Sequence, residues 1–451
     1  MTLPIDIAAE RFPDRLAFDD GTKQITYGDL PGLIVSSQVF ERLVLPACEH
    51  VAWCPCNDLQ SFVTFWAMQR RSLVACPISH RFPVAKREQI VTQINATWLE
   101  MIEPGGTVRQ HADAGQNDRT PNQPATLILT SGSSGKPKAV VHSVDAHIAS
   151  AKGAESQIAL GPGDRWLWSL PLCHVSGLSI LIRCAVAGAT VVGLQSESTF
   201  NASLLAEHRV THLSAVSTQI RRLLAEEDFP SPHLKSVLLG GSGVDPKLVS
   251  EARHRGVRLH TTYGLTETAS QVTTSTATDD AAVSGRILPG RRVKLSATGE
   301  ILVGGETLCL GYYLDGRIES VVDEGGWFPT GDLGRWTDDG QLIVKGRIDN
   351  QFISGGENIH PENIERAMME AFGVDEVIVV PKPCETYGER PIAYVRGNLP
   401  ADWPDQLRRS LQGYEIPTEI LPWPSGSDSD IKPDRRKLID QVSVRTNRNP
   451  L

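Results

Sequence analysis

Short apolar segments rich in β-branched residues alternate with helical patterns through the first three quarters of the chain. The clearest of these segments cover residues 126–130, 189–194 and 236–239. Buried strands interleaved with helices are typical of α/β layers with largely parallel sheets. The pattern therefore predicts an α/β architecture for this part of the chain.

The pattern changes after Gly285, where short strands with glycine turns predict a smaller β-rich subdomain. The residues at 338–340, Asp-Asp-Gly between two apolar segments, predict a hairpin. Further on, the spacing predicts a helix over about 361–372 that begins at Pro361, a strand over 376–380, a helix over about 402–412 and a polar tail.

We therefore expect two domains. The first, residues 1–347, would contain layered α/β subdomains and the β-rich subdomain, and the second, residues 348–451, would be a small mobile α+β domain.

The length of the chain indicates more than one domain, and its charge argues against one class of function. The chain has 451 residues, more than one hydrophobic core usually organises. Its formal charge of -9 argues against nucleic-acid binding, which depends on many Lys and Arg side chains. A small polyanion is not excluded, because it needs only a local cluster of N–H groups and a few cations.

Cysteine usage and hydropathy indicate a cytoplasmic protein. The 8 cysteines are scattered without a CxxC pair, which favours reduced thiols, and the amino terminus has no secretory pattern. The apolar stretch at 175–193 is almost long enough to cross a bilayer, but Arg183 lies at its centre and Gly188 interrupts it. We expect a buried helix followed by a buried strand there.

One loop combines glycines, hydroxyls and lysines directly after the expected strand 126–130. Glycines let backbone N–H groups converge on one point, hydroxyls add donors and lysines add charge, so the loop suits a nucleotide phosphate. Pro137 rules out a Walker loop, which opens a helix at this point. The alternative is a solvated turn. The residues are Thr130, Ser131, Gly132, Ser133, Ser134, Gly135, Lys136, Pro137 and Lys138.

A second segment carries an aromatic ring, a threonine and a carboxylate in close succession. The ring of Tyr263 suits a base, Thr266 a phosphate, and Glu267 a Mg²⁺ ion that bridges phosphate oxygens. The glycines of the preceding segment 240–243 would let a flat ring lie close to backbone. The alternative is a structural Tyr and Glu at the end of a strand.

A third segment contains Asp332, followed by Arg347. A carboxylate accepts both hydroxyls of a ribose, and an arginine donates to the same sugar. The alternative is an Asp that caps a turn.

Taken in this order, the segments resemble the adenylate-forming superfamily of acyl-CoA synthetases, luciferases and peptide-synthetase adenylation domains. The resemblance runs from about Ile25 to the carboxyl terminus. It implies that the protein activates a carboxylic acid with ATP and passes the acyl group to coenzyme A, with Mg²⁺ on Glu267. The ATP- and AMP-binding residues that it implies are Thr130, Ser131, Gly132, Ser133, Ser134, Gly135, Lys136, Lys138, Gly240, Gly241, Ser242, Thr262, Tyr263, Gly264, Asp332 and Arg347.

The resemblance also implies roles for the C-terminal segments. Gly355 and Gly356 match the glycine loop that lines the coenzyme A tunnel, and Asp349 falls where the family has its hinge. The catalytic lysine would be Lys432, although Ile431 replaces the family's glycine before it; Lys437 is the weaker candidate. The catalytic residues implied are Lys432, Thr266, Glu267 and His174.

Within the superfamily, the compact chain and the segments at 174–183, 214–219 and 354–365 most resemble the o-succinylbenzoate–CoA ligases of menaquinone synthesis. An acid with an aromatic ring and two carboxylates requires a second cationic or donor group in its pocket. Arg183 is our candidate, because it shares a helical face with Ser176 and Ser179; a structural ion pair is the alternative. The substrate-binding residues expected are His174, Ser176, Arg183, Ser217 and Thr218.

Two other functions stay open at this stage. One is a CoA ligase for another aryl or medium-chain acid, and the other is a non-catalytic nucleotide-binding regulatory protein. The presence of Lys136, Glu267 and Lys432 argues against the second. The expected partners are the acid, ATP and coenzyme A, with neither nucleic acid nor a membrane span, and the sequence is compatible with a homo-oligomer.

Overall fold

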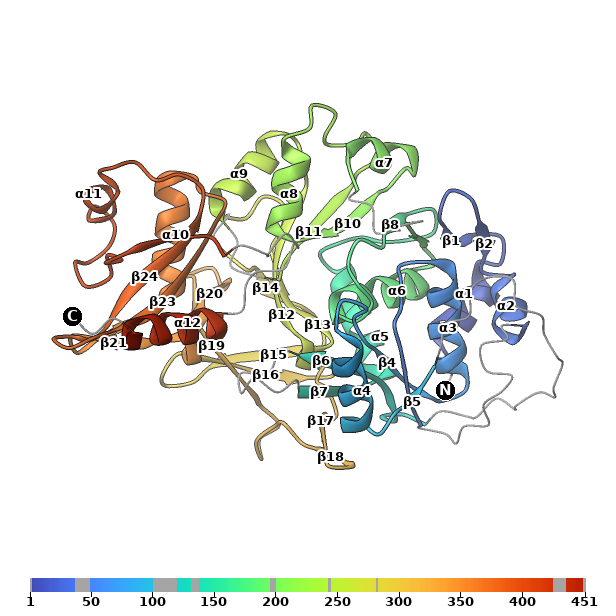
Figure 1. Ribbon diagram of the computed structural model, residues 1–451. Helices are drawn as coiled ribbons and strands as arrows, with labels where there is room; N and C mark the ends of the chain where they lie inside the picture. Colours follow the sequence, from blue (N-terminus) through green and yellow to red (C-terminus); the bar gives the residue numbers. More distant parts are fainter. Residues whose placement is uncertain are drawn as a thin grey trace.

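The computed structural model of the chain describes residues 2–36, 49–99, 120–130, 138–194, 200–241, 245–280, 283–424 and 435–448, with side chains in the last range described as far as Val442. Figure 1 shows two parts. The C-terminal elements gather on one side of the view, and the α/β layers with their covering helices fill the rest.

The largest sheet in the described part of the chain has nine strands. Its middle strands are parallel, while the pairs β1–β2, β12–β13 and β13–β14 are antiparallel. In spatial order the strands are β14 (Arg286–Ile287), β13 (Ser270–Thr274), β12 (Leu259–Leu265), β11 (Ser236–Leu239), β10 (His212–Ala215), β8 (Arg165–Leu167), β9 (Thr190–Val192), β1 (Leu16–Asp19) and β2 (Gln24–Thr26).

A second, seven-stranded sheet lies beside it in the described part of the chain. The strand predicted at 126–130 is β6, which pairs parallel with β4 and antiparallel with β7. In spatial order the strands are β18 (Arg317–Glu319), β17 (Gly311–Leu314), β7 (Lys138–Ser143), β6 (Pro124–Thr130), β4 (Val74–Pro77), β3 (His50–Trp53) and β5 (Thr97–Trp98).

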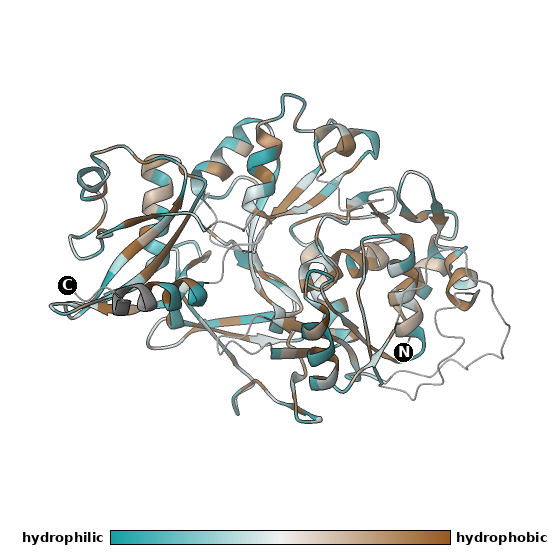
Figure 2. Cartoon of the chain, viewed as in Figure 1, coloured by the Kyte–Doolittle hydropathy of each residue, from teal (hydrophilic) through white to brown (hydrophobic). Residues whose placement is uncertain are grey.

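Helices cover these sheets, and Figure 2 shows hydrophobic residues along many of the strands and on parts of the helices. Helix α9, for example, buries Leu248, Val249 and Ala252. The helices of this part are α1 (Pro4–Arg11), α2 (Leu30–Ser36), α3 (Leu59–Arg70), α4 (Val84–Gln93), α5 (Val144–Glu155), α6 (Val175–Ala187), α7 (Ala202–Glu207), α8 (Ser217–Leu224) and α9 (Pro246–His254).

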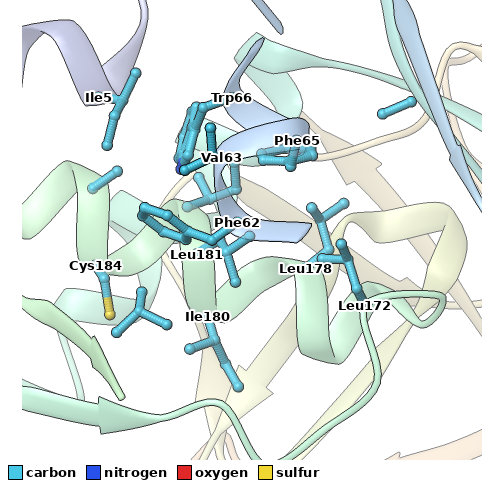
Figure 3. Packing of buried hydrophobic residues seen from close by; sticks show 14 of the residues in the cluster. Ile5, Phe62, Val63, Phe65, Trp66, Leu172, Leu178, Ile180, Leu181 and Cys184 are labelled. Carbon is cyan, nitrogen blue, oxygen red and sulfur yellow. The ribbon is translucent and has the colours of Figure 1, made fainter. Parts of the chain in front are cut away.

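The apolar stretch at 175–193 forms a buried helix and a buried strand, as predicted. Helix α6 ends at Gly188, whose φ of 69° is left-handed and suits glycine, and β9 follows. Leu178 and Leu181 of α6 pack with Phe62 of α3 in one hydrophobic cluster (Figure 3). Each such leucine stabilises the fold by about 2 kcal/mol. In the described ranges, no helix has the length and apolar character needed to cross a membrane.

The β-rich subdomain predicted after Gly285 is a separate four-stranded antiparallel sheet. The predicted hairpin at 338–340 joins β19 to β20, and its register pairs Asp332 with Arg347. In order, the strands are β15 (Arg291–Leu295), β16 (Glu300–Gly305), β19 (Phe328–Trp336) and β20 (Leu342–Arg347).

The C-terminal unit is an α+β layer that follows the short helix η3 (Ile348–Asn350). The predicted helix at Pro361 is confirmed as α10 (Pro361–Phe372), and the predicted strand lies within β23. The helix predicted over 402–412 is shorter, because α11 (Trp403–Leu407) gives way to turns through Ser410 and Gly413, which are poor helix formers. The remaining elements are β21 (Phe352–Ser354), β22 (Glu357–Ile359), β23 (Glu376–Cys384), β24 (Gly388–Arg396), β25 (Ile420–Pro422) and α12 (Arg435–Arg448).

The predicted fold class is therefore confirmed: layered α/β sheets, a β-rich subdomain and a smaller α+β unit. The predicted domain boundary after Arg347 falls between β20 and η3. It stays a prediction, as does the mobility of the C-terminal domain.

Candidate active site

Several predicted site residues gather where the parallel strands β10, β11 and β12 end. Ligands of open α/β sheets bind at the carboxyl ends of such strands. Gly240 and Gly241 follow β11, and a Cβ atom on Gly240 would lie 2.8 Å from Cγ2 of Thr262 on β12. This close approach explains a glycine there. Ser217 and Thr218 open α8, just after β10.

Tyr263, Asp332 and Arg347 form one hydrogen-bonded cluster. The Tyr263 hydroxyl donates to Oδ2 of Asp332 at 2.8 Å, and Nη1 of Arg347 donates to Oδ1 at 3.3 Å. Asp332 is buried, whereas the Arg347 side chain is 41% exposed and can therefore reach a ligand. At Gly331, φ is 73° and a Cβ would lie 2.8 Å from Nη2 of Arg347, so glycine is needed there.

The protonation states of this cluster follow from its burial. Burial raises the pKa of Asp332, and the hydrogen bond from Tyr263 and the charge of Arg347 offset this only in part. Burial and the charge of Asp332 raise the pKa of Tyr263 well above its ordinary value, so the phenol keeps its proton and stays a donor. Most of the Tyr263 ring is covered by a cluster with Val272, Ile301, Val303 and Leu342, and its stacking on adenine stays a prediction.

The turn that carries Thr266 and Glu267 is the short helix η2 (Thr266–Thr268) directly after β12. The backbone N–H of Cys309 donates to the Glu267 carbonyl at 2.8 Å. The Tyr312 hydroxyl donates to Oε1 of the half-buried Glu267 at 2.8 Å. The turn is thus held through both its backbone and its carboxylate.

Two buried histidines lie next to the same turn, and one of them hydrogen-bonds its backbone. Nε2 of His142 lies 2.6 Å from the Thr266 carbonyl and must donate, because a carbonyl only accepts. Thr126 lies between the rings, with Oγ1 at 3.5 Å from Nδ1 of His142 and 2.8 Å from Nε2 of His147. Burial lowers the pKa of His142 to about 4, so it is neutral near pH 7. It also lowers the pKa of His147 well below the ordinary value.

Arg183 is a buried cation beside this turn. Its Nη2 donates to Oε1 of Gln271 at 2.6 Å and to Oγ of Ser270 at 3.2 Å, and its guanidinium lies 5.3 Å from the Trp166 ring centroid. Burial lowers the pKa of Arg183 to about 10, which leaves it charged near pH 7.

The partners that the described residues give Arg183 are an amide and a hydroxyl, and none of these residues forms an ion pair with it. Within the same residues, its buried Nε has no hydrogen-bond partner.

The other predicted acid-side residues divide into two groups. The Ser179 hydroxyl is satisfied within α6 by the carbonyl of Ser176 at 2.8 Å. The buried hydroxyls of Ser217 and Thr218, by contrast, find no hydrogen-bond partner in the described ranges. His174 is exposed at the start of α6.

Several predicted residues lie outside the described ranges: Ser131, Gly132, Ser133, Ser134, Gly135, Lys136, Ser242 and Lys432. The two ends of the predicted phosphate loop are described. Thr130 on β6 and Lys138 on β7 are paired residues of an antiparallel register, so the loop connects these two strands.

The C-terminal candidates lie on exposed backbone. Gly355 and Gly356 form the turn of the β21–β22 hairpin with φ of 61° and 88°. Asp349 in η3 pairs with Arg347 at 3.3 Å, and Lys437 is exposed on α12. The structure thus brings together the strand-end residues, whereas none of the described hydrogen bonds connects Gly355 or Gly356 to them.

Four residues around this site were missed by the sequence analysis: His142, Gln271, Arg291 and Tyr312. Arg291 is buried and donates to backbone carbonyls that include Gln271 at 2.9 Å. A signal existed only for His142, a polar residue within the apolar strand pattern of residues 139–142.

Comparisons with known proteins agree on one family. A family model described as AMP-binding enzyme matches residues 97–313. The 2-succinylbenzoate–CoA ligase of Salmonella typhimurium (strain LT2) is 38% identical over 402 residues, which cover 86% of each chain.

Solved structures give the same result. A variant of Escherichia coli MenE with bound OSB-AMS superimposes with a TM-score of 0.86 at 30% identity and 98% coverage of both chains. The o-succinylbenzoate coenzyme A synthetase of Bacillus subtilis, in complex with ATP and magnesium ion, has a TM-score of 0.84 at 25% identity, covering 97% of this chain and 98% of that one.

Proposed function

The chain belongs to the AMP-binding enzyme family, and from this premise we propose that it converts o-succinylbenzoate, ATP and coenzyme A into o-succinylbenzoyl-CoA, AMP and pyrophosphate. Its 2-succinylbenzoate–CoA ligase relatives support this substrate. The structural observation that carries the choice is the buried, charged Arg183, which donates to Gln271 and Ser270 and has a further donor nitrogen that no described residue satisfies. A second carboxylate on the substrate would complete it.

In the first step, an oxygen of the reacting carboxylate attacks the α-phosphorus of ATP, and the bond from that phosphorus to pyrophosphate breaks. The acid gains AMP as a leaving group that a thiol can displace. Asp332 and Arg347 would hold the ribose, and Thr266 would contact the α-phosphate. Gly240, Gly241 and Gly264 would lie beside the base and the phosphates, and at Gly240 and Gly264 the close approach of Thr262 and Ser270 leaves no room for a side chain.

The residues present fit a magnesium ion that is held mainly by the nucleotide. The described residues contain no group of three His, Cys, Asp or Glu side chains that could hold a metal. Magnesium is usually bound through one or two carboxylates together with substrate phosphates, and the half-buried Glu267 is such a carboxylate. When bound, the ion would neutralise charge that develops on the phosphates.

On the acid side, Arg183 would donate to the non-reacting carboxylate, while Ser217 and Thr218 offer hydroxyls that no described residue satisfies. A fixed, desolvated guanidinium favours a dicarboxylic acid over a fatty acid, because an apolar acid would leave the cation unpaired. His174 and Ser176 would lie at the pocket wall.

In the second step, the coenzyme A sulfur attacks the acyl carbon and the bond to AMP breaks. Gly355 and Gly356 would line the path of the thiol after the C-terminal domain turns about Asp349. Lys432 would serve the first step and withdraw before the second. We place the protein in the cytoplasm, where ATP and coenzyme A are available; a homo-oligomer is compatible with this function.

The role of the glycine turn has a direct test in Gly356→Trp. We expect thioester formation from supplied acyl-adenylate to fall by at least about a hundredfold while adenylate formation changes little, because the ring fills a path used only in the second step. Gly356→Ala is the control, since it meets the same positive φ of 88° without the ring. Equal loss of both half-reactions in single-turnover measurements would make the turn merely structural.

Product analysis tests the function itself. With Mg-ATP, coenzyme A and o-succinylbenzoate, the protein is expected to form the CoA thioester with AMP and pyrophosphate. A panel of aryl and medium-chain acids separates this function from a ligase for another acid. ADP as product, or equal use of simple fatty acids, would refute the assignment, and no turnover with any acid would favour a regulatory nucleotide-binding protein.

A further inference from the structure

Tyr312 lies between two charged residues of the nucleotide side that come from different elements. Strand β17, which carries it, pairs antiparallel with β7, and Tyr312 is opposite Val140. Its hydroxyl donates to Oε1 of Glu267 at 2.8 Å, and Nζ of Lys138 lies 4.7 Å from its ring centroid. One side chain therefore contacts both the carboxylate and the first residue of β7.

The chemistry of the two contacts is complementary. A lysine ammonium over a tyrosine ring is attracted by the negative face of the ring. The phenol is the donor of this hydrogen bond, because a carboxylate oxygen only accepts. A carboxylate has about four acceptor positions, so one bond from Tyr312 orients Glu267 and leaves positions for a cation.

Other contacts fix the backbone of the turn, but they do not fix the Glu267 carboxylate. The carbonyls of Thr266 and Glu267 are fixed by His142 and by the backbone of Cys309. The Glu267 side chain, in contrast, is half-buried and has rotatable bonds that backbone contacts do not fix. Groups that hydrogen-bond a metal-binding carboxylate fix its orientation and affect metal affinity.

We propose that Tyr312 is a positioning residue that orients Glu267 for the nucleotide-bound divalent cation and holds Lys138 over its ring, so that the two charged groups are placed together. The inference rests on the proposed function, because it takes Glu267 as the metal-binding carboxylate.

Two substitutions separate the two contacts of Tyr312. Tyr312→Phe keeps the ring and removes the hydroxyl, and Tyr312→Leu removes both. Tyr313→Phe is the matched control, since the neighbouring Tyr313 is buried on the other face of β17, where its ring meets His50 edge-on at 4.6 Å.

The measured quantity is the affinity of the full-length protein for Mn²⁺ in the presence of a non-hydrolysable ATP analogue. The electron paramagnetic resonance signal of free Mn²⁺ reports how much of the ion is unbound. Binding of the analogue without metal is measured by calorimetry. For Tyr312→Phe we expect about tenfold to a hundredfold weaker Mn²⁺ binding, with metal-free binding of the analogue unchanged. For Tyr312→Leu both are expected to weaken, and Tyr313→Phe should match the wild type in both.

Wild-type Mn²⁺ affinity in Tyr312→Phe would overturn the inference, as would the same loss in Tyr313→Phe. Thermal midpoints of the variants show whether each has folded, and a Tyr312→Phe protein that folds keeps the test decisive if Tyr312→Leu does not. Failure of the proposed function can be distinguished from failure of this inference. A wild type that binds Mn²⁺ in the Tyr312-dependent way but makes no thioester of o-succinylbenzoate would leave the inference standing and remove the substrate.

Discussion

The proposed nucleotide side and the proposed acid side of the site differ in whether their buried polar groups have hydrogen-bond partners. On the nucleotide side, the buried Asp332 accepts hydrogen bonds from both Tyr263 and Arg347. On the acid side, Nε of Arg183 and the hydroxyls of Ser217 and Thr218 are buried without hydrogen-bond partners in the described part of the chain.

Under the proposed function, this difference would separate a preformed nucleotide site from an acid site that the ligand completes. A buried donor without a partner costs about 1–3 kcal/mol, and a ligand that accepts a hydrogen bond from it recovers this cost on binding. A cluster with internal partners is already oriented and loses little on binding. Nucleotide binding should therefore depend on a prearranged cluster, and selectivity for the acid should depend on the unpaired donors.

The largest effect is expected from Arg183→Leu. The kcat/KM for o-succinylbenzoate should fall by about a hundredfold to a thousandfold, since losing one partner of a buried charge pair costs about 2–5 kcal/mol. The KM for ATP should change little. Steady-state kinetics against each substrate provide the measurement, and Arg183→Lys should lie between, because it keeps the charge but not the planar fork. An equal rise in the KM for ATP would break the proposed separation of the two sides.

A smaller effect is expected from Asp332→Asn on the nucleotide side. Binding of an ATP analogue, measured by calorimetry, should weaken by about tenfold, on the scale of a charged hydrogen bond worth about 1.5 kcal/mol or more. Recognition of the acid should be unaffected. Tyr263→Phe removes only the internal bond to Asp332 and should have a smaller effect. Asp332→Asn acting mainly on the KM for the acid would reverse the comparison.

The last prediction concerns stability and not substrate binding, and it involves the buried His142, which contacts the Thr266–Glu267 turn. The pKa of His142 is about 4 in the fold against an ordinary 6.5, so between these values the unfolded chain binds a proton that the folded one does not. Stability is therefore lost as pH falls through this window, by about 2 kcal/mol for His142 between pH 7 and pH 5.

Urea unfolding at the two pH values measures this effect. The loss of stability on acidification should be smaller in His142→Gln, which keeps an amide donor for the Thr266 carbonyl but does not titrate. An identical loss in wild type and variant would show that His142 does not titrate as its burial predicts.

The sequence predicts the fold class, which follows from the alternation of strands and helices. The motifs name candidate residues on single segments, namely Tyr263 to Glu267, Asp332 and Arg347, and the structure brings Tyr263, Asp332 and Arg347 together. The sequence could not predict contacts between distant segments, because these contacts depend on how the sheets pack. His142 contacts Thr266 across 124 residues of chain, and Tyr312 contacts Glu267 across 45. The sequence singles out Arg183 as a candidate, but it does not show the amide partner Gln271, which lies 88 residues away.

The most direct test of the account is acid-dependent exchange of labelled pyrophosphate into ATP by the wild-type protein, which reports the first step alone. Three acids are compared: o-succinylbenzoate, its analogue without the ring carboxylate and its analogue without the chain carboxylate. We expect exchange with the dicarboxylic acid to exceed that with either analogue by at least about a hundredfold in kcat/KM, as required if Arg183 recognises the non-reacting carboxylate. An analogue with one carboxylate that supports exchange as well as o-succinylbenzoate would contradict the account.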